Sequence, residues 1–416
     1  MEAEKNKLGM FSSICIFAAY ITAVNIMPSG CFIGLGSKLI QGIAAIIVTW
    51  IVLVGLGVAN GSIGQRTGMG ASAIWKVVYG SSGFMLPATA YAVATTVWHI
   101  FDIYMFAAVC REIFPNHQVL AFVGGAIIVS AISLIGGIKG TDGVKLISNL
   151  TIPVAAALFI VVIVATIHHG GGLNAMASYT PAAPISALAA CSLGINTWLT
   201  ADCIFSDITK DCKNMKCVFG GIGVGFVMLV LILFVGMFGA MTFGITDIAT
   251  LASSLGGVLF VITSVFVWIS PINTCPTGVF LASNNYQKVF KTKSSAPFCW
   301  MICILGAVGA CFVEYVTSLS IFSLVIIVVA LCFSPTMGAT IGEYWFVRYG
   351  YLSEETPTVK WKARGLIALF TGFAVGIICT YVLHVPLTGV ICAVVSFVVD
   401  IIIGKIGSEK ENKVLL

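Results

Sequence analysis

Twelve apolar runs, each long enough to cross a bilayer as a helix, follow one another along this chain of 416 residues. A spanning helix needs about 20 apolar residues, and lipid admits only helices and closed barrels because no water there can satisfy exposed backbone groups. The sequence therefore predicts an all-α polytopic membrane protein with about twelve transmembrane helices. We place these spans at roughly residues 9–35, 37–60, 84–111, 118–137, 145–168, 183–205, 218–244, 254–283, 297–313, 317–337, 364–384 and 386–404.

Charged residues make up only 9% of the chain, whereas a soluble domain carries about 25%. So few charges cannot cover a water-facing surface, which excludes a soluble globular protein, a nucleic-acid binder and a disordered chain. The loops are short, so we expect one transmembrane domain over residues 1–416 with no soluble domain attached. No small-residue cleavage site follows the run that begins at Leu8, which indicates a retained helix rather than a signal peptide.

The basic residues predict which way the chain crosses the membrane, because cytoplasmic loops carry an excess of Lys and Arg. We take the N-terminus and every loop from an even to an odd span as inside. Only Lys38 and Arg111 of the 21 Lys and Arg residues then fall outside, which leaves nineteen inside. A wrong span count would scramble this alternation. The pattern predicts twelve spans of a cell (inner) membrane, with both termini cytoplasmic.

Two spans carry helix-breaking residues at comparable places, proline and glycine within residues 25–30 and glycine within residues 194–197. Proline removes a backbone donor and glycine loosens a helix, and broken backbone at membrane depth survives only against protein or a water-filled cavity. These two spans would be the first members of two groups of five, spans 1–5 and spans 6–10. This pattern is typical of inverted-repeat transporters, although ordinary kinks are the alternative. The expected divisions are a first repeat at about 9–168, a second at about 183–337, and two added helices at about 364–404.

The third predicted span places three chemically notable side chains on one helical face, because Thr95, Trp98 and Asp102 recur at i, i+3 and i+7. A charge inside a span is costly unless it faces a cavity or a partner. Asp102 is therefore a candidate proton carrier or a hydrogen-bond acceptor for a substrate. The alternative is a structural acid bonded to a neighbouring hydroxyl or to His99. Trp98 offers a flat face on which an aromatic ring can stack.

The eighth predicted span contains two prolines five residues apart, which loosen the helix around a group of oxygen-bearing side chains. Ser270, Asn273, Thr274 and Thr277 would present these oxygens on one flank. A hard cation such as sodium takes several oxygen ligands, so this flank is a candidate sodium site. Plain helix packing is the alternative reading of the same hydroxyl groups.

No group of residues in the sequence is arranged for catalysis. There is no Ser/His/Asp or Cys/His arrangement, no phosphate-binding loop, and no zinc-spaced cluster among the 14 cysteines. We therefore expect neither an enzyme nor an ATP-driven pump made by this chain alone, and no cofactor. The cysteines are expected to be small apolar core residues.

Five motifs, spread from the first span to the loop after the tenth, resemble the nucleobase–cation symporter family (family one), in particular its bacterial cytosine and purine permease branch. The motifs are GQRTG at 64–68, LP at 86–87 with Trp98 eleven residues beyond, GLNA at 172–175, LTAD at 199–202, and SPTMG at 334–338 followed by EYW at 343–345 and Arg348.

The resemblance implies a five-plus-five inverted repeat with broken helices 1 and 6 and two added C-terminal helices. Substrate would lie mid-membrane between the first, third, sixth and eighth spans, with Trp98 stacked on the heterocycle. Leu193 matches the position of a second aromatic, for which the nearby Trp198 could substitute. The expected substrate-binding residues are Thr95, Trp98, Asp102, Leu193, Asn196, Trp198, Thr277 and Gly278, and the candidate sodium ligands are Ala18, Ile21, Ser270, Asn273 and Thr274.

The chain departs from the family at positions that would read the substrate. Thr95 replaces a glutamine one turn before the tryptophan in cytosine permease, and Asp102 replaces a glutamine one turn after it in a hydantoin carrier. Thr277 and Gly278 stand where the eighth span carries asparagines that read the base. An ionised carboxylate accepts hydrogen bonds but donates none. We therefore expect amino-bearing or cationic rings, such as aminopyrimidines and purines, over uracil-like or hydantoin-like ones.

The leading expectation is a secondary active symporter that imports a nucleobase or related nitrogen heterocycle (cytosine- or purine-like) with Na⁺ or H⁺ by alternating access. Asn273 and Thr274 fit sodium, whereas Asp102 with His99 fits protons. The alternatives are an importer of hydroxymethylpyrimidine or another vitamin-precursor ring, and an amino-acid or amine carrier of the same fold. Trp98 argues against the amine carrier, because an aliphatic amine needs no flat face. We expect a functional monomer in the lipid bilayer and no nucleic-acid partner.

Overall fold

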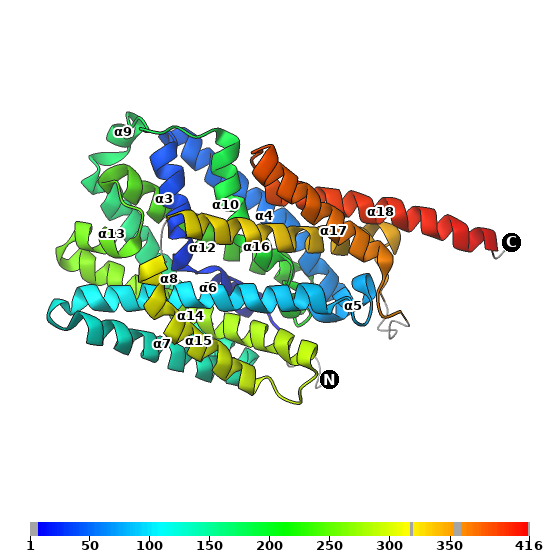
Figure 1. Ribbon diagram of the computed structural model, residues 1–416. Helices are drawn as coiled ribbons and strands as arrows, with labels where there is room; N and C mark the ends of the chain where they lie inside the picture. Colours follow the sequence, from blue (N-terminus) through cyan, green and yellow to red (C-terminus); the bar gives the residue numbers. More distant parts are fainter. Residues whose placement is uncertain (1–6, 317–318, 353–358, 415–416) are drawn as a thin grey trace.

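The structure is a computed structural model that describes residues 7–316, 319–352 and 359–414 (Figure 1). It is an all-helical bundle in which no strand occurs among these residues. Its elements are α2 (Met10–Ile21), η1 (Val24–Ile26), α3 (Met27–Gly36), α4 (Leu39–Thr67), α5 (Ala71–Tyr79), α6 (Met85–Ile113), η2 (Pro115–His117), α7 (Gln118–Lys139), α8 (Thr141–His169), α9 (Gly172–Ala177), α10 (Ala187–Asp202), α11 (Ser206–Thr209), α12 (Met215–Phe243), α13 (Ile248–Leu255), α14 (Gly257–Phe290), α15 (Ala296–Val316), α16 (Leu319–Ile341), η3 (Gly342–Val347), α17 (Ala363–Ile377), η4 (Ile378–Val382) and α18 (Thr388–Val414).

The helices agree with the twelve predicted spans. In the described part of the chain, nine helices are long and apolar enough to cross a membrane, and the bent pair from Met10 to Gly36 makes ten. The sixth span coincides with α10, which is shorter, and the tenth coincides with α16. Residues 317–318, where the tenth span was expected to begin, lie outside the described residues. The predicted fold class, an all-α polytopic membrane protein, is confirmed.

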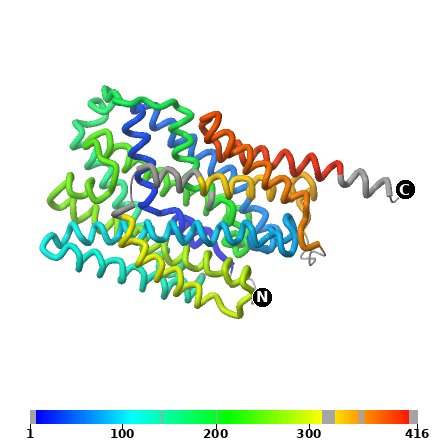
Figure 2. Tube along the Cα trace, viewed as in Figure 1, coloured from blue at the N-terminus to red at the C-terminus, as the bar shows by residue number. Residues whose placement is uncertain are grey.

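The first span is broken, but closer to its start than the sequence predicts. Residues Thr22 and Ala23 separate α2 from η1, and the two halves meet at a bend of 51° that Figure 2 shows in the blue segment. Pro28 lies in the first turn of α3, where a missing N–H costs nothing because the first turn has no intrahelical acceptor for it. The proline therefore begins the outer half-helix and does not lie within the break.

The predicted break of the sixth span at residues 194–197 is wrong in position. Helix α10 runs unbroken through Gly194 to Asp202, and the interruption comes at residues 203–205, before α11. A glycine without a proline keeps its backbone donor, so it can remain helical. At Gly194 the missing side chain leaves room for Thr49 of α4, which an added Cβ would strike. This glycine thus serves the packing of two helices.

Helices α3 and α12 pack with their backbones almost in contact. Gly30 and Gly34, one turn apart on α3, face the main chain of Leu233 and Met237, and Gly236 of α12 faces α3 in return. Any side chain at these three positions would strike backbone atoms. Small residues at such spacing let membrane helices approach closely, which supplies the van der Waals contact that holds them together.

The loops predicted to be inside meet at one end of the bundle. The Leu8 N–H donates to the Asp211 carbonyl at 2.7 Å and the Lys213 N–H donates to the Leu8 carbonyl at 3.0 Å, which makes a short parallel bridge. The Ser82 N–H donates to the Lys360 carbonyl at 2.8 Å. In Figure 1 this end lies to the right, where α5 is drawn. The basic residues of these loops are thereby gathered on one side, as the charge pattern predicts.

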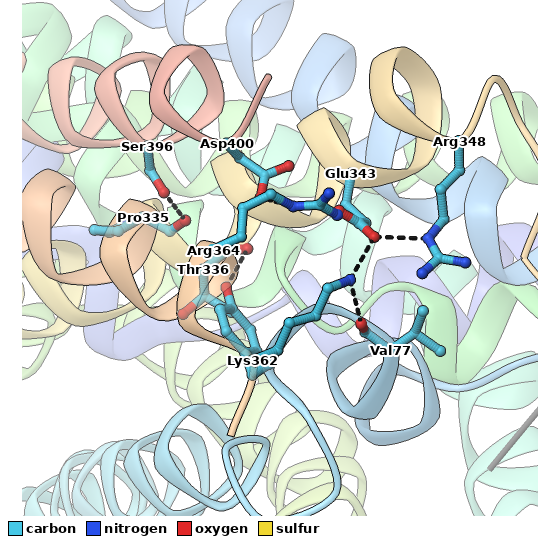
Figure 3. Close-up of polar contacts among 10 residues, drawn as sticks. Val77, Pro335, Thr336, Glu343, Arg348, Lys362, Arg364, Ser396 and Asp400 are labelled. Atoms are coloured by element: carbon cyan, nitrogen blue, oxygen red, sulfur yellow. Dashed lines mark hydrogen bonds and ion pairs between the residues drawn. The ribbon is translucent and has the colours of Figure 1, made fainter. Parts of the chain in front are cut away.

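A buried carboxylate ties the tenth helix to the last two helices at this same end. Glu343 lies in the turn η3, and its side chain is fully buried. Its Oε1 accepts from Arg348 Nε at 2.6 Å and from Lys362 Nζ at 2.8 Å, and its Oε2 pairs with Arg364 (Figure 3). Arg364 also pairs with the buried Asp400 of α18 at 3.4 Å. We call these five residues the Glu343 cluster.

The Glu343 cluster also reaches the turn between the second and third spans. Lys362 Nζ donates to the Val77 carbonyl of α5 at 3.0 Å, and the Lys362 N–H donates to the Tyr79 carbonyl at 2.9 Å. Burial, together with the neighbouring Arg348, lowers the pKa of Lys362 to about 8. The buried ammonium group of Lys362 therefore gives up a proton more readily than that of a solvent-exposed lysine.

Candidate functional site

A cavity of about 540 Å³ lies at the centre of the bundle, where the first, third, sixth and eighth spans meet. These are the four spans that the family resemblance names. Its walls are Tyr20, Ala23, Asn25, Ile26, Tyr91, Thr95, Trp98, His99, Asp102, Thr197, Trp198, Ala201, Thr274, Cys275 and Gly278.

Helix α6 supplies the most polar wall of this central cavity. Thr95, Trp98 and Asp102 of the predicted helical stripe all line it, together with Tyr91 and His99. The carboxyl of Asp102 is buried, with the residue only 3% exposed. Trp98 is held by Phe101, whose ring centroid lies 6.0 Å from its own. The aromatic and acidic side chains that the sequence pointed to therefore share one chamber.

Two tyrosines join the first and third spans beside the cavity. The hydroxyl groups of Tyr20 and Tyr91 lie 2.8 Å apart and are buried. Trp198 of α10 packs edge-on against Tyr20, with ring centroids 5.3 Å apart. Trp98 and Trp198 are thus the two indole walls of the cavity, one from the third span and one from the sixth.

Four buried side chains around the cavity carry polar atoms without a hydrogen-bond partner among the described residues. The atoms are Asn25 Oδ1, both ring nitrogens of His99, Asp102 Oδ1 and Trp198 Nε1. Each buried polar atom left unpaired costs about 1–3 kcal/mol, and more if it is charged. All four of these residues are among those that line the central cavity.

Three of the expected substrate residues lie outside the central cavity. Leu193 and Asn196 line a second, outer cavity of about 1290 Å³ between α3, α10, α16 and the start of α18. Thr277 lines a third, inner cavity of about 360 Å³ beside Asp207 and Leu281. The second indole of the central cavity is Trp198 and not a residue at position 193. Thr95, Trp98, Asp102, Trp198 and Gly278 do line it.

Hydroxyl groups of the eighth span meet the carbonyls freed by the first break. Ser270 Oγ and Thr274 Oγ1 donate to the Thr22 carbonyl at 2.7 and 2.5 Å, and Ser270 Oγ accepts from the Val24 N–H at 2.9 Å. Thr274 Oγ1 also lies 3.3 Å from the Ala19 carbonyl. All these groups are buried. The break in the first span therefore depends on this part of α14 for its hydrogen bonds.

The other candidate sodium ligands are placed differently. Asn273 turns toward α8, where its Oδ1 accepts from Thr151 at 2.6 Å, so it does not face the first span. The Ala18 carbonyl accepts from Thr22 of its own helix, and the Ile21 carbonyl accepts from the Ala23 N–H at 2.8 Å. The carbonyls that α14 contacts are those of Ala19 and Thr22, each one residue beyond an expected ligand.

The sequence reasoning missed Tyr20 and Tyr91, although a signal for one of them was present. Tyr91 lies four residues before Thr95, so it continues the stripe of Thr95, Trp98 and Asp102 at helical spacing. Tyr20 immediately precedes the last residue of α2 and belongs to none of the sequence motifs. Its place in the site follows only from the position of the bend.

A comparison with known proteins agrees with this architecture. No family model matches the chain. Cytosine permease of Escherichia coli (strain K12) is 23% identical over 328 residues, which is 76% of this chain and 73% of that protein. Mhp1, described as a nucleobase-cation-symport-1 family transporter, superposes with a TM-score of 0.79 in a closed conformation with bromovinylhydantoin bound. The chain is a homologue of cytosine permease and shares its fold with Mhp1. The family resemblance inferred from the motifs is confirmed, and these relatives are transporters rather than enzymes.

Solved structures of this fold include other transporters. The closed Mhp1 structure is 18% identical and covers 95% of this chain and 92% of that one. An inward-facing Mhp1 structure has a TM-score of 0.80 at 17% identity, covering 98% and 92%. A Na⁺-coupled sialic acid symporter superposes with a TM-score of 0.65 at 9% identity, covering 96% and 90%. Because proteins of this fold carry such different substrates, the fold alone does not identify the substrate of this chain.

Proposed function

We propose that the protein is a secondary active symporter that imports a nucleobase or related nitrogen heterocycle together with a cation. The central cavity carries this proposal, because its two indole walls and the polar side chains of Asn25, His99 and Asp102 suit a flat, hydrogen-bonding ring. The relatives support it, since one is a cytosine permease and another was solved with a hydantoin bound. Alternating access would expose the cavity to one side of the membrane at a time.

The polar atoms of the cavity favour an amino-bearing ring. Asn25 Oδ1 and an ionised Asp102 only accept hydrogen bonds, whereas Trp198 Nε1 only donates one. A ring that presents an amino group and a ring nitrogen, such as an aminopyrimidine or a purine, matches two acceptors and one donor. A ring that presents mainly carbonyl oxygens would leave an ionised Asp102 unpaired.

The oxygen atoms between α2 and α14 fit a sodium ion as the coupling cation. The carbonyls of Ala19 and Thr22 and the hydroxyls of Ser270 and Thr274 are a purely oxygen donor set, which a hard cation prefers. Hydroxyl groups rotate, so both could turn lone pairs toward an ion. These residues would hold sodium, whose charge would stabilise the bend of the first span beside the substrate. A proton on Asp102 or His99 is the alternative coupling ion.

We further propose that the protein lies in the cell (inner) membrane with both termini cytoplasmic. The gathering of the basic loops at one end of the bundle supports this orientation. The repeats would run from about 9 to 168 and from about 183 to 337, followed by two added helices at about 364–404.

Labelled uptake in reconstituted vesicles tests the proposal. Cytosine, adenine, hypoxanthine, uracil and hydroxymethylpyrimidine would be supplied with and without sodium, at two pH values. We expect saturable, cation-dependent uptake of an amino-bearing base. Preference for hydroxymethylpyrimidine would point to the vitamin-precursor importer. Saturable uptake of a simple amino acid with no competition from any base would contradict the proposal.

Replacing Trp98 by alanine is expected to weaken uptake, because the stacking face is lost. Stacking of a base on an aromatic side chain is worth about 1–3 kcal/mol, so the apparent KM should rise about 5- to 150-fold. Trp268→Ala is the matched control, since Trp268 packs on Phe106 at 5.9 Å and lines none of the three cavities. Equal effects of both variants on KM would count against stacking at Trp98.

Replacing Ser270 by alanine tests the sodium site. Loss of this hydroxyl should raise the half-saturating sodium concentration about tenfold, both for uptake and for sodium-dependent thermal stabilisation of the purified protein. Ser264→Ala is the control, because the Ser264 hydroxyl is equally buried on α14 but donates to the Phe260 carbonyl of its own helix at 2.7 Å. Sodium-independent wild-type uptake driven by a pH gradient would favour the proton instead.

A further inference from the structure

The turn between the last two spans forms part of the wall of the outer cavity. It runs from His384 to Thr388, between η4 and the first residue of α18, and we call it the outer turn. All of its residues except Leu387 line the outer cavity, as do Ser192 and Asn196 of α10. The two added helices therefore reach the outer side of the central cavity through this turn.

A hydrogen bond ties the outer turn to the sixth span. The Leu387 N–H donates to Ser192 Oγ at 3.0 Å, and the same oxygen accepts from Asn196 Nδ2 at 3.2 Å. Beside this bond, Gly389 packs on Asn196 so closely that an added Cβ would lie 2.6 Å from Asn196 Oδ1. The outer turn is thus fastened to the helix whose Trp198 forms a wall of the central cavity.

The outer turn makes this bond in a backbone conformation that residues other than glycine rarely adopt. His384 has a φ of 50° and Leu387 a φ of 61°, both in the left-handed region. His384 follows the end of a helix, where glycine is the usual residue, whereas Leu387 directly precedes the start of α18. Such residues persist only where the surrounding structure holds them, and they cluster in segments that switch. The outer turn is therefore strained while it is bonded to Ser192.

Helix α10 is joined more firmly to α3 and α4 than to the outer turn. Just before α10 begins, the Ile185 N–H donates to the Gly36 carbonyl at the end of α3 at 2.8 Å, a bond between two main chains. Further along, Gly194 lets α10 pack closely on α4. Beyond its inner end, Cys203 Sγ donates to the Phe333 carbonyl of α16 at 3.0 Å. These contacts allow the outer half of α10 to tilt together with α3 and α4 about its inner end.

The outer turn is fixed to α16 through α18. Gly338 of α16 faces the main chain of Ala393, so that any side chain there would strike it. Ser396 Oγ donates to the Pro335 carbonyl at 2.7 Å (Figure 3). The bond from the outer turn to Ser192 therefore crosses a seam between two groups of helices, α3 with α4 and α10 on one side, and α16 with α17 and α18 on the other.

The structure has most of its free space on the outer side of the central cavity, since the outer cavity measures about 1290 Å³ and the inner one about 360 Å³. A bond that is made in one conformation and broken in another shifts the population toward the first. We propose that the outer turn is a strained strap that bonds to Ser192 only while the outer cavity is open, and that it thereby sets the balance between the outward-facing and inward-facing states. This inference rests on the proposed function, because it concerns how that transporter alternates.

Thiol labelling of the full chain in lipid nanodiscs measures this balance without any transport. Phe32→Cys places a thiol on the α3 wall of the outer cavity, and Leu281→Cys places one in the inner cavity, where Leu281 is 3% exposed. A charged methanethiosulfonate reagent reaches both sides of a nanodisc, and peptide mass spectrometry separates the two sites from the native cysteines. The ratio of the outer to the inner labelling rate follows the ratio of the two states.

Ser192→Ala, added to this doubly labelled protein, removes the bond across the seam. Loss of one hydrogen bond changes an equilibrium about two- to twelvefold, so the ratio of outer to inner labelling should fall by that factor. Ser192→Thr keeps the hydroxyl group and should restore the ratio. Ser186→Ala is the matched control, because Ser186 also lines the outer cavity but its Oγ accepts from the Ala189 N–H at 3.1 Å, at the start of the same helix.

His384→Gly should change the ratio in the opposite direction. Glycine adopts the left-handed conformation without a steric cost, so the substitution relieves strain in the strap and should raise the ratio of outer to inner labelling. Tyr349→Gly is the control, because Tyr349 has a φ of 52° but lines none of the three cavities. It should leave the ratio unchanged.

The possible failures are distinguishable. An unchanged ratio in Ser192→Ala, or the same change in Ser192→Ala and Ser186→Ala, would overturn the strap. An unchanged or lower ratio in His384→Gly would overturn it as well. Because labelling needs no substrate, a wild-type protein that takes up no base would overturn the proposed function alone, and the labelling ratio would still decide on the strap.

Discussion

Asp102→Asn is expected to reverse the preference of the transporter for amino-bearing rings. The substitution keeps the shape of the side chain but replaces one acceptor oxygen with a donor NH₂ group. A hydrogen bond to a charged group is worth about 1.5–3 kcal/mol, so uptake of cytosine or adenine should fall about 10- to 150-fold. Uracil presents a carbonyl group where cytosine presents an amino group. Uptake of uracil should therefore fall less than uptake of cytosine, or should rise. The ratio of cytosine to uracil uptake should therefore move toward uracil.

Competition uptake of the two bases in vesicles, at two pH values, measures this ratio. Asp202→Asn is the matched control, because Asp202 is a fully buried acid whose two carboxyl oxygens also lack a hydrogen-bond partner among the described residues. Asp202 does not line the central cavity. An unchanged cytosine-to-uracil ratio and unchanged pH dependence in Asp102→Asn, or the same change in both variants, would show that Asp102 does not read the substrate.

Glu343→Gln is expected to destabilise the protein more than any of the other substitutions considered above. Glu343 is fully buried, and its neutralisation leaves Arg348, Lys362 and Arg364 crowded together with one acid, Asp400, between them. Breaking a buried ion pair by removing one partner costs about 3–5 kcal/mol. The three basic side chains are 38%, 25% and 19% exposed, so water takes up part of their charge and the cost should lie toward the lower end.

Thermal unfolding of the purified protein in nanodiscs, followed by tryptophan fluorescence, measures the loss. Glu112→Gln is the control, because Glu112 forms an exposed pair with Arg111 at 3.9 Å and such pairs contribute about 1 kcal/mol or less. If Glu343→Gln unfolded at the same temperature as Glu112→Gln, the Glu343 cluster would not hold α16, α17 and α18 together. The yield of monodisperse protein should fall in parallel.

The positions of most helices were predictable because a bilayer restricts what a spanning segment can be. Each span must be a long apolar run, and each loop near the cytoplasm collects basic residues, so both patterns could be counted directly. The breaks were less predictable. Pro28 interrupts a helix only if residues before it are helical, and here it lies in the first turn of α3. Gly194 leaves space for the side chain of Thr49 on another helix. Such a contact between distant parts of the chain cannot be predicted from the residues around Gly194.

The candidate site was predictable on the third span and not on the sixth. Thr95, Trp98 and Asp102 share a face whatever their neighbours do, because that face follows from helical spacing alone. Asn196 and Trp198 were assigned to one site from the family resemblance, which does not say which face of the helix each residue occupies. Since α10 is continuous there, two residues of separation turn the side chains by about 200°, and they line different cavities.

The bridge between Leu8 and residues 211–213 bears on the order in which the protein is made. Leu8 bonds to Asp211 and Lys213, which emerge from the ribosome some two hundred residues later. At roughly 5–20 residues per second, the first span waits about 10–40 s for that partner. The Ser82–Lys360 bond has to wait longer still. The end of the bundle that gathers the basic loops is thus completed last, after every helix that surrounds the central cavity has already been inserted.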